Sequence, residues 1–133
     1  MNHGEPWRRY KPISNYGLIG NCSTAALVGL DGSIDWCCFP RFDAPSVFGA
    51  ILDVNDGGRF SITPQSTYTS TQRYADESNV LETQFVTRRG ICRITDCMPL
   101  YLRKDGDTVG LHKIIRVVRC REGTMNLRIE CAP

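Results

Sequence analysis

The strongest local signals of the chain lie in one stretch, Asp31-Gly32-Ser33-Ile34-Asp35-Trp36-Cys37-Cys38-Phe39-Pro40-Arg41-Phe42-Asp43. Asp-Gly is a strong hairpin signal, because both central positions of such a turn take a positive φ. The apolar segment Thr24–Leu30 leads into the turn, and Ile34–Phe39 leads out of it. Pro40 has no N–H to donate and therefore ends the second strand. The stretch predicts a β-hairpin.

Polar and aromatic groups lie in and after the second strand of this predicted hairpin. Asp35 and Trp36 belong to the strand, and Arg41, Phe42 and Asp43 follow it. Loops at the edges of a rigid scaffold often carry recognition groups. These five residues are therefore our candidates for the rim of a substrate site or for contact with another domain.

Length and composition are those of an ordinary globular domain. The chain has 133 residues, of which 41% are hydrophobic and 23% charged, and its net charge is +2. We expect one domain over residues 1–133 and no nucleic-acid partner. No apolar run approaches the roughly 18 residues of a membrane span. Met1–Tyr10 lacks the apolar core of a signal peptide, which predicts a cytoplasmic protein without a membrane partner.

The seven cysteines do not form the pattern of a disulfide framework or a metal site. Their number is odd, Cys37 and Cys38 are adjacent, and there is no Cys-x-x-Cys pair. Only His3 and His112 could join them on a metal. We therefore expect reduced thiols, no metal and no cofactor. Three cysteines in apolar runs are expected to be small buried hydrophobes; they are Cys92, Cys120 and Cys131.

The rest of the chain is a succession of short strand patterns separated by turn signals. Ala44–Asp53 is turn-rich with at most a short helical turn, and Asp56-Gly57-Gly58 is a turn. Arg88-Arg89-Gly90 and Arg121-Glu122-Gly123 are predicted hairpin connections. The predicted strands are Leu18–Ile19, Thr24–Leu30, Ser33–Phe39, Arg59–Pro64, Ser66–Tyr74 (an exposed or edge strand), Val80–Thr87, Ile91–Met98, Thr108–Cys120 and Thr124–Cys131.

Period-two alternation supports the last of these strands. Met125, Leu127, Ile129 and Cys131 alternate with polar residues, which predicts a half-buried strand. No segment keeps a helical period over a dozen residues. Many short strands with turns between them predict an all-β fold, an antiparallel β-sandwich of the supersandwich kind.

Several of these motifs, taken in order, resemble the N-terminal region of glycoside hydrolase family 15 proteins, the glucoamylase and trehalase-like group. The resemblance covers nearly the whole chain. It rests on Tyr10-Lys11-Pro12-Ile13-Ser14-Asn15-Tyr16-Gly17-Leu18-Ile19-Gly20-Asn21, Gly32-Ser33-Ile34-Asp35-Trp36, Pro40-Arg41-Phe42-Asp43-Ala44-Pro45-Ser46-Val47-Phe48, Gly57-Gly58-Arg59-Phe60, Asn79-Val80-Leu81-Glu82-Thr83 and Asp96-Cys97-Met98-Pro99.

The resemblance implies a β-sandwich that precedes an (α/α)6 barrel. In such proteins the barrel carries the catalytic glutamates and hydrolyses α-glucosidic bonds with inversion. Nothing in this chain has the length or helical period of that barrel. Asn15 and Asn21 stand where the family usually has Asp, which weakens a role for charge there. The chain ends directly after a predicted strand, as expected of a domain cut from a longer protein.

Residues of the chain do not make a convincing active site by themselves. Inverting hydrolysis needs an acid and a base about 6.5–9.5 Å apart. Asp35 and Asp43 are the available carboxylates, but a sandwich edge offers no deep pocket to raise the pKa of an acid. We therefore expect no catalytic residue here. Arg41 and Asp43 either pair to order their loop or reach a sugar at a domain boundary.

Two further residues have competing interpretations. Trp36 is either a core residue or a platform for a sugar ring, and the core role is the commoner one for a strand tryptophan. Asp96 shares its strand face with Cys92 and Ile94, so it is expected to be semi-buried and structural rather than catalytic.

Two functions fit these features. A non-catalytic domain that docks on the barrel of the same protein should expose an apolar face, through which the isolated domain can form a homodimer. In that case α-glucan or trehalose would be bound by the full protein. A stand-alone carbohydrate-binding or protein-interaction module would instead need exposed aromatics, for which Tyr68, Tyr74 and Tyr101 are candidates.

Overall fold

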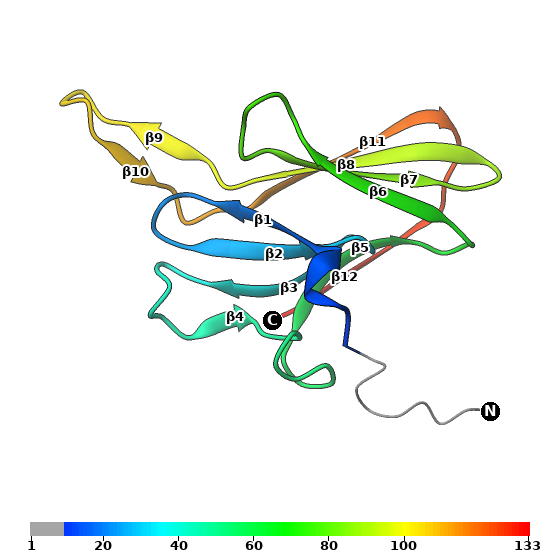
Figure 1. Ribbon diagram of the computed structural model, residues 1–133, viewed down its shortest axis with the longest axis horizontal. Coiled ribbons are helices and arrows are strands. Elements are labelled where there is room, and N and C mark those ends of the chain that lie inside the picture. Colours follow the sequence, from blue (N-terminus) through cyan, green and yellow to red (C-terminus); the bar gives the residue numbers. More distant parts are fainter. Residues whose placement is uncertain (1–9) are drawn as a thin grey trace.

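Two antiparallel sheets face each other in the computed structural model, which describes residues 10–133 (Figure 1). One 3₁₀ turn, η2 (Ile13–Asn15), precedes the strands. The strands are β1 (Tyr16–Gly20), β2 (Ala25–Gly29), β3 (Ser33–Cys38), β4 (Ser46–Phe48), β5 (Arg59–Pro64), β6 (Thr69–Tyr74), β7 (Leu81–Val86), β8 (Gly90–Cys97), β9 (Leu100–Leu102), β10 (Thr108–Gly110), β11 (Ile115–Gly123) and β12 (Leu127–Ala132). The prediction of an all-β sandwich is confirmed.

The strands divide between the two sheets in a simple order. The first sheet runs β1-β2-β3-β5-β12, with β4 paired to β3, and the second runs β11-β8-β7-β6. A separate hairpin, β9–β10, extends away from both (Figure 1). The predicted edge strand is confirmed, since β6 ends the second sheet. β4 lies in the segment 44–53, for which the sequence had predicted turns.

The predicted hairpin around Asp31 and Gly32 is present, with a different turn. The Gly32 N–H donates to the carbonyl oxygen of Gly29 at 2.9 Å, and only Gly32 of the two central residues has a positive φ, +81°. This is the pattern of a three-residue loop that closes on a left-handed glycine. The Asp31 carboxylate accepts the Ser33 N–H at 3.1 Å, as its expected turn role requires.

Two clusters of apolar side chains fill the space between the sheets. The larger joins β1, β2, β3 and β4 to β7 and the segment after β8. It contains Ile19, Ala26, Val28, Ile34, Cys37, Phe48, Leu81 and Met98. The smaller consists of Ile62, Phe85 and Ile94. The predicted burial of Cys92 is confirmed.

The expected hairpin across Arg121-Glu122-Gly123 is wrong. The predicted strand 108–120 is divided between β10 and β11, and β11 continues to Gly123 beside β8. A bulge between Cys120 and Glu122, followed by Gly123 at φ +62°, redirects the chain. The chain then crosses to the other sheet, where β12 pairs with β5.

This crossover leaves the sandwich open along one side. Val118 lies opposite the buried Ile94, and Ile129 lies opposite the buried Ile62, so both face the interior. Nevertheless Val118 is 39% and Ile129 64% exposed. We call the inward-facing residues of these two edge strands, apart from the buried Arg116, the open margin; they are Val118, Cys120, Leu127, Ile129 and Cys131.

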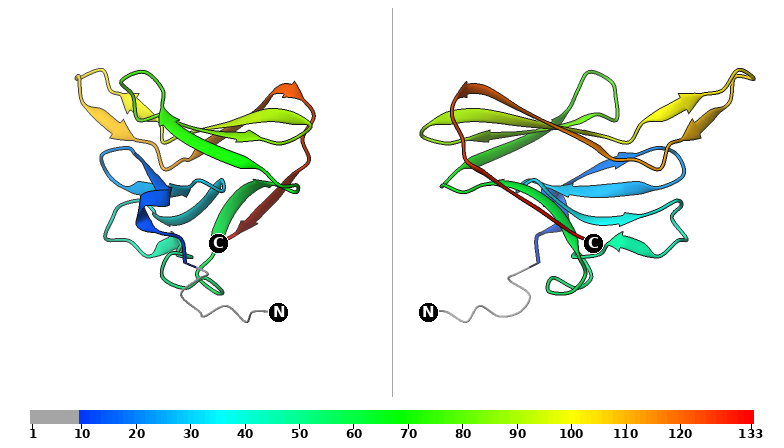
Figure 2. Two further views of the ribbon diagram at one scale, coloured as in Figure 1. Left: turned by 45° about the vertical axis from the view of Figure 1, so that its right-hand side comes forward. Right: turned by 180° about the vertical axis from the view of Figure 1, so that it is seen from behind.

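The opposite side of the sandwich is closed by hydrogen bonds. Side chains of β6 reach the β1–β2 hairpin: Gln72 Nε2 donates to the carbonyl oxygens of Val28 and Gly29, both at 3.1 Å. Tyr74 Oη donates to the carbonyl oxygen of Leu18 at 2.8 Å. β11 and β12, each the last strand of its own sheet, lie on the other side (Figure 2).

The open margin corrects three burial predictions. Cys120 and Cys131 are exposed, because each lies on the edge strand of its sheet. For the same reason β12 is mostly exposed, although its alternation predicted a half-buried strand.

We expect Gly32→Ala to destabilise the fold by about 2–4 kcal/mol, because a left-handed alanine is strained and its Cβ would meet the carbonyl oxygen of Ile62. Gly106 provides a matched control. It has φ +92°, but apart from its two chain neighbours no residue has an atom within 4 Å of the position that a Cβ would take, so Gly106→Ala should cost only about 1 kcal/mol. Urea unfolding of both variants measures the difference, and equal losses would contradict the close approach at Gly32.

Candidate functional site

A bulge in β3 sets the directions of Asp35 and Trp36. Leu27 pairs with Trp36 and Val28 with Ile34, so Asp35 is the extra residue between them. Bulges re-aim side chains in this way. The strand therefore sends Ile34 and Cys37, three positions apart, into the same core cluster. Trp36 is half-buried and belongs to neither cluster, so the expected core role for it is wrong.

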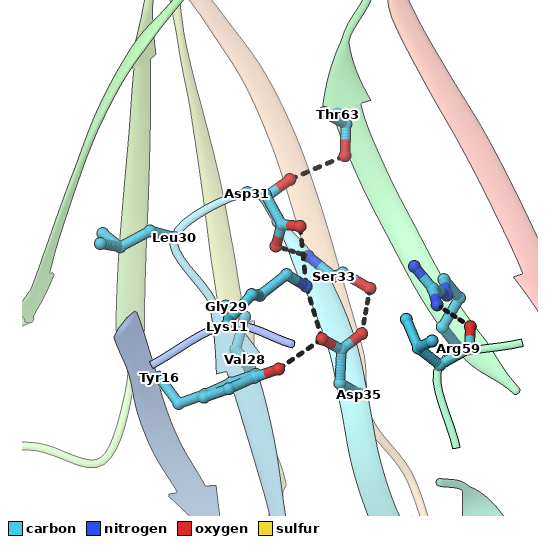
Figure 3. Close-up of polar contacts among 12 residues, drawn as sticks. Lys11, Tyr16, Val28, Gly29, Leu30, Asp31, Ser33, Asp35, Arg59 and Thr63 are labelled. Atoms are coloured by element: carbon cyan, nitrogen blue, oxygen red, sulfur yellow. Dashed lines mark hydrogen bonds and ion pairs between the residues drawn. The ribbon is translucent and has the colours of Figure 1, made fainter. Parts of the chain in front are cut away.

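Asp35 is the centre of a polar cluster between the N-terminal segment and β3 (Figure 3). One carboxylate oxygen accepts from Lys11 Nζ at 2.5 Å and from Tyr16 Oη at 2.6 Å. The other accepts from Ser33 Oγ at 2.5 Å. Lys11 Nζ also lies 2.7 Å from the carboxylate of Asp31. The cluster ties the chain before β1 to the β2–β3 hairpin.

These contacts fix the charge state of Asp35. Burial acts to raise the pKa of its carboxyl, but hydrogen bonds from Lys11, Ser33 and Tyr16 outweigh burial, and the pKa lies below its ordinary value. Burial raises the pKa of Tyr16, and its hydrogen bond to Asp35 adds to that rise. A carboxylate held ionised on both oxygens is unsuited to be a general acid, which needs a raised pKa. The geometry gives Asp35 a structural role.

Arg41, Phe42 and Asp43 form an exposed loop beyond the other end of β3. Arg41 Nη2 donates to the Asp43 carboxylate at 3.0 Å, and both side chains are largely exposed. Such surface pairs contribute little to stability. Phe42 is 57% exposed, and its N–H donates to the carbonyl oxygen of Ser23 at 3.2 Å. Within residues 10–133, no hydrogen bond or ion pair joins this loop to Asp35 or Trp36.

Asp96 is fully buried, deeper than its expected semi-buried position. Its carboxylate oxygens accept from Arg116 Nε at 2.7 Å and Arg116 Nη2 at 3.2 Å. Burial raises the pKa of Asp96, while the guanidinium acts against that rise. Arg116 was missed at the sequence level. Arg116 lies directly opposite the inward-facing Asp96, and this pairing follows from the strand register, which the sequence does not show.

Other binding features are weak on the described part of the chain. A polar surface hollow of about 370 Å³ lies over β3, β5 and β12, lined in part by Ser33, Arg59 and Ser61, without an aromatic residue. Among residues 10–133, no three His, Cys, Asp or Glu side chains gather to hold a metal. His3 and most of the segment Met1–Tyr10, for which the sequence predicts no signal peptide, lie outside the described residues. No helix within residues 10–133 is long and apolar enough to cross a membrane.

Comparison with known proteins gives one consistent family. Residues 6–133 match the family described as "Trehalase-like, N-terminal". A trehalase of Mycolicibacterium smegmatis is 35% identical over 93% of this chain and 20% of its own length. A trehalase of Mycobacterium tuberculosis is 33% identical over 100% of this chain and 22% of its own length. A trehalase of Thermoplasma volcanium is 47% identical over 68% of this chain and 15% of its own length.

These matches assign the sandwich to one family of N-terminal domains. The chain belongs to the family of trehalase-like N-terminal domains. It spans about a fifth of the length of the two mycobacterial relatives and 15% of the Thermoplasma volcanium one. No solved structure matches the chain. The resemblance stated from its motifs is confirmed.

We expect Asp35→Asn to lower the free energy of unfolding by about 2–3 kcal/mol at neutral pH, because Lys11 loses a buried partner. The pKa of Asp35 is lower in the folded than in the unfolded state. Its contribution is therefore complete above the unfolded pKa of about 4 and is lost as the pH falls through the folded pKa.

Urea unfolding of wild type and variant at a series of pH values tests this. The stability difference should shrink towards zero in acid. Asp43→Asn is the control, since its ion pair is exposed and should give little change at any pH. A difference that persists unchanged in acid would contradict the ionised state of Asp35.

Proposed function

We propose that this chain is a non-catalytic N-terminal domain of a trehalase-like glycoside hydrolase, and that it docks on and supports an (α/α)6 catalytic barrel of the same protein. The open margin is the observation that carries the proposal. Val118 and Ile129 face the sandwich interior but remain exposed, as expected of a surface that is covered in the complete protein. The short coverage of the trehalase relatives supports such a partner.

The carboxylates of the chain do not support a catalytic role. Asp35 is held ionised by Lys11, Tyr16 and Ser33, and it offers no proton to a leaving group. Asp43 pairs with Arg41 in an exposed loop without a pocket around it. The loop 41–43, with Phe42 exposed, is proposed as a contact to the barrel or to the rim of its sugar site.

The reaction of the whole protein is proposed from the relatives. All three that are described above are trehalases, which favours trehalose over α-glucan as the sugar that is hydrolysed, with inversion, by the barrel. The proposal includes no cofactor, nucleic acid or membrane. The seven unpaired cysteines support a reducing compartment, the cytoplasm.

The alternative function, a stand-alone sugar-binding module, has less support. Tyr68 packs edge-to-face on the buried Phe85 at 5.1 Å, and Tyr74 bonds to the backbone of β1. Both candidate platforms are thus engaged in the fold. Tyr101 on β9 is exposed, and Tyr74 on β6 is 47% exposed, but the two lie in different sheets. The alternative predicts heat with trehalose or maltose in calorimetry of the isolated chain, and our proposal predicts none.

A graft into the Mycolicibacterium smegmatis trehalase tests the docking. We expect deletion of its matching segment to abolish trehalose hydrolysis, and replacement by this chain to restore it. Ile129→Asp in the graft should lower the restored activity by at least about tenfold, because docking would bury an unpaired carboxylate. Leu18→Asp is the matched control, since Leu18 is 51% exposed on β1 at the opposite edge of the same sheet.

Two results would contradict the proposal. One is trehalose hydrolysis by residues 1–133 alone. The other is equal activity of the Ile129→Asp and Leu18→Asp grafts. The open margin also gives the isolated chain a surface for a homodimer, and sedimentation of wild type against Ile129→Asp measures whether that margin mediates it.

A further inference from the structure

Two cysteines face each other across neighbouring strands at the open margin. Cys92 on β8 and Cys120 on β11 are direct partners in the antiparallel register. Directly opposite residues in such a ladder project on the same face, with Cα atoms about 4.5–5.5 Å apart. A disulfide needs Cα atoms about 4.4–6.8 Å apart. The register therefore meets the main geometric requirement for a cross-strand disulfide without moving the backbone.

The two thiols differ in accessibility. Cys92 is 2% exposed, while Cys120 is exposed at the edge of the second sheet. Cys120 Sγ lies 3.5 Å from the carbonyl oxygen of Glu122 and 3.3 Å from that of Gly123. Burial raises the pKa of Cys92 to about 11, and contact with the Cys120 thiol adds to that rise. The Cys120 thiol is thus accessible to a reagent in solution, and the Cys92 thiol is buried beside it.

The other cysteines lack this arrangement. Within residues 10–133, Cys37 lies opposite Phe48, Cys97 opposite Ile115, and Cys131 opposite Phe60. Cys22 is exposed in the turn between β1 and β2. Cys92 and Cys120 are the only cysteines that the described strand registers bring together.

We propose that Cys92 and Cys120 form a reversible disulfide site that reacts with small-molecule disulfides such as oxidised glutathione. This inference rests on the strand register and on the exposure of Cys120. Because Cys120 belongs to the open margin, the site is proposed for the chain while that margin is not docked. Intracellular disulfides of this kind are commonly transient and redox-sensing.

The chemistry proceeds in two thiol–disulfide exchanges. The Cys120 thiolate attacks one sulfur of oxidised glutathione, forms a mixed disulfide and releases one glutathione thiolate. The Cys92 thiolate then attacks the Cys120 sulfur and releases the second glutathione thiolate. The two protein thiols are oxidised, one oxidised glutathione is reduced to two glutathione molecules, and the two protons of the thiols pass to solvent.

The disulfide would staple the edge strand β11 to β8 next to the bulge that starts the crossover. It would also close the chain between residues 92 and 120, which contains the β9–β10 hairpin. A covalent link over a loop of this length restricts the unfolded chain and raises stability. Oxidation would therefore make the open margin more rigid.

Oxidised glutathione added to the reduced chain tests the site. After alkylation of the remaining thiols, non-reducing peptide mapping should find Cys92 joined to Cys120, and the melting temperature should rise by at least about 5 °C. Cys120→Ser should abolish both effects, and Cys22→Ser should retain both. The second exchange, followed from the isolated mixed disulfide, should become faster as the pH rises above neutrality, since burial raises the pKa of the attacking Cys92.

Three results would overturn the inference. The first is that Cys120 remains as the glutathione mixed disulfide while Cys92 can still be alkylated after unfolding. The second is a cross-link from Cys120 to Cys22 or to Cys131. The third is a cross-link that persists in Cys92→Ala, a second variant that removes the buried thiol with a small loss of volume.

Discussion

The relative position of the two sheets depends on the buried side chain of Arg116. From β11 in the second sheet, its Nη1 donates to the carbonyl oxygen of Phe60 at 2.8 Å, and its Nη2 to that of Gly32 at 2.7 Å. Both acceptors belong to the first sheet and its hairpin loop. Asp96 on β8 balances the charge, and the guanidinium lies 4.9 Å from the Phe60 ring centre. Leaving a buried charge without a partner is strongly destabilising. The bonds of Arg116 to Asp96 and to the carbonyl oxygen of Phe60 therefore hold β8 and β5 in fixed positions.

The same strand that carries Arg116 also creates the open margin. Arg116, Val118 and Cys120 share the inner face of β11, but only Arg116 reaches the opposite sheet. Val118 and Cys120, which follow Arg116 on this face, are exposed at the edge of the sheet. Polar anchoring by Arg116 and apolar exposure beside it agree with the docking that we propose. The cysteine pair lies where this exposed end begins.

Local signals predicted much of the fold. Asp31-Gly32 and Arg88-Arg89-Gly90 placed two hairpins, and alternation identified most strands. What failed depended on contacts between distant residues. The bulge at Asp35 and the crossover after Gly123 each depend on the conformation of a single residue. The alternation of apolar and polar residues in the sequence does not predict such a local change. The candidate residues divide accordingly: Asp35 proved to be a buried anchor held by Lys11, while Arg41, Phe42 and Asp43 kept the exposed position that their loop predicted.

A double-mutant cycle on Arg116 and Asp96 tests most directly whether the buried guanidinium that bridges the two sheets depends on Asp96 to balance its charge. Arg116→Met and Asp96→Leu should each lower the free energy of unfolding by about 3–5 kcal/mol, because each leaves a buried charge without its partner. The double variant removes both charges and should lose much less than the sum, with a coupling of about 2 kcal/mol or more. Losses that add to within about 0.5 kcal/mol would show that the two residues act independently and would contradict this account.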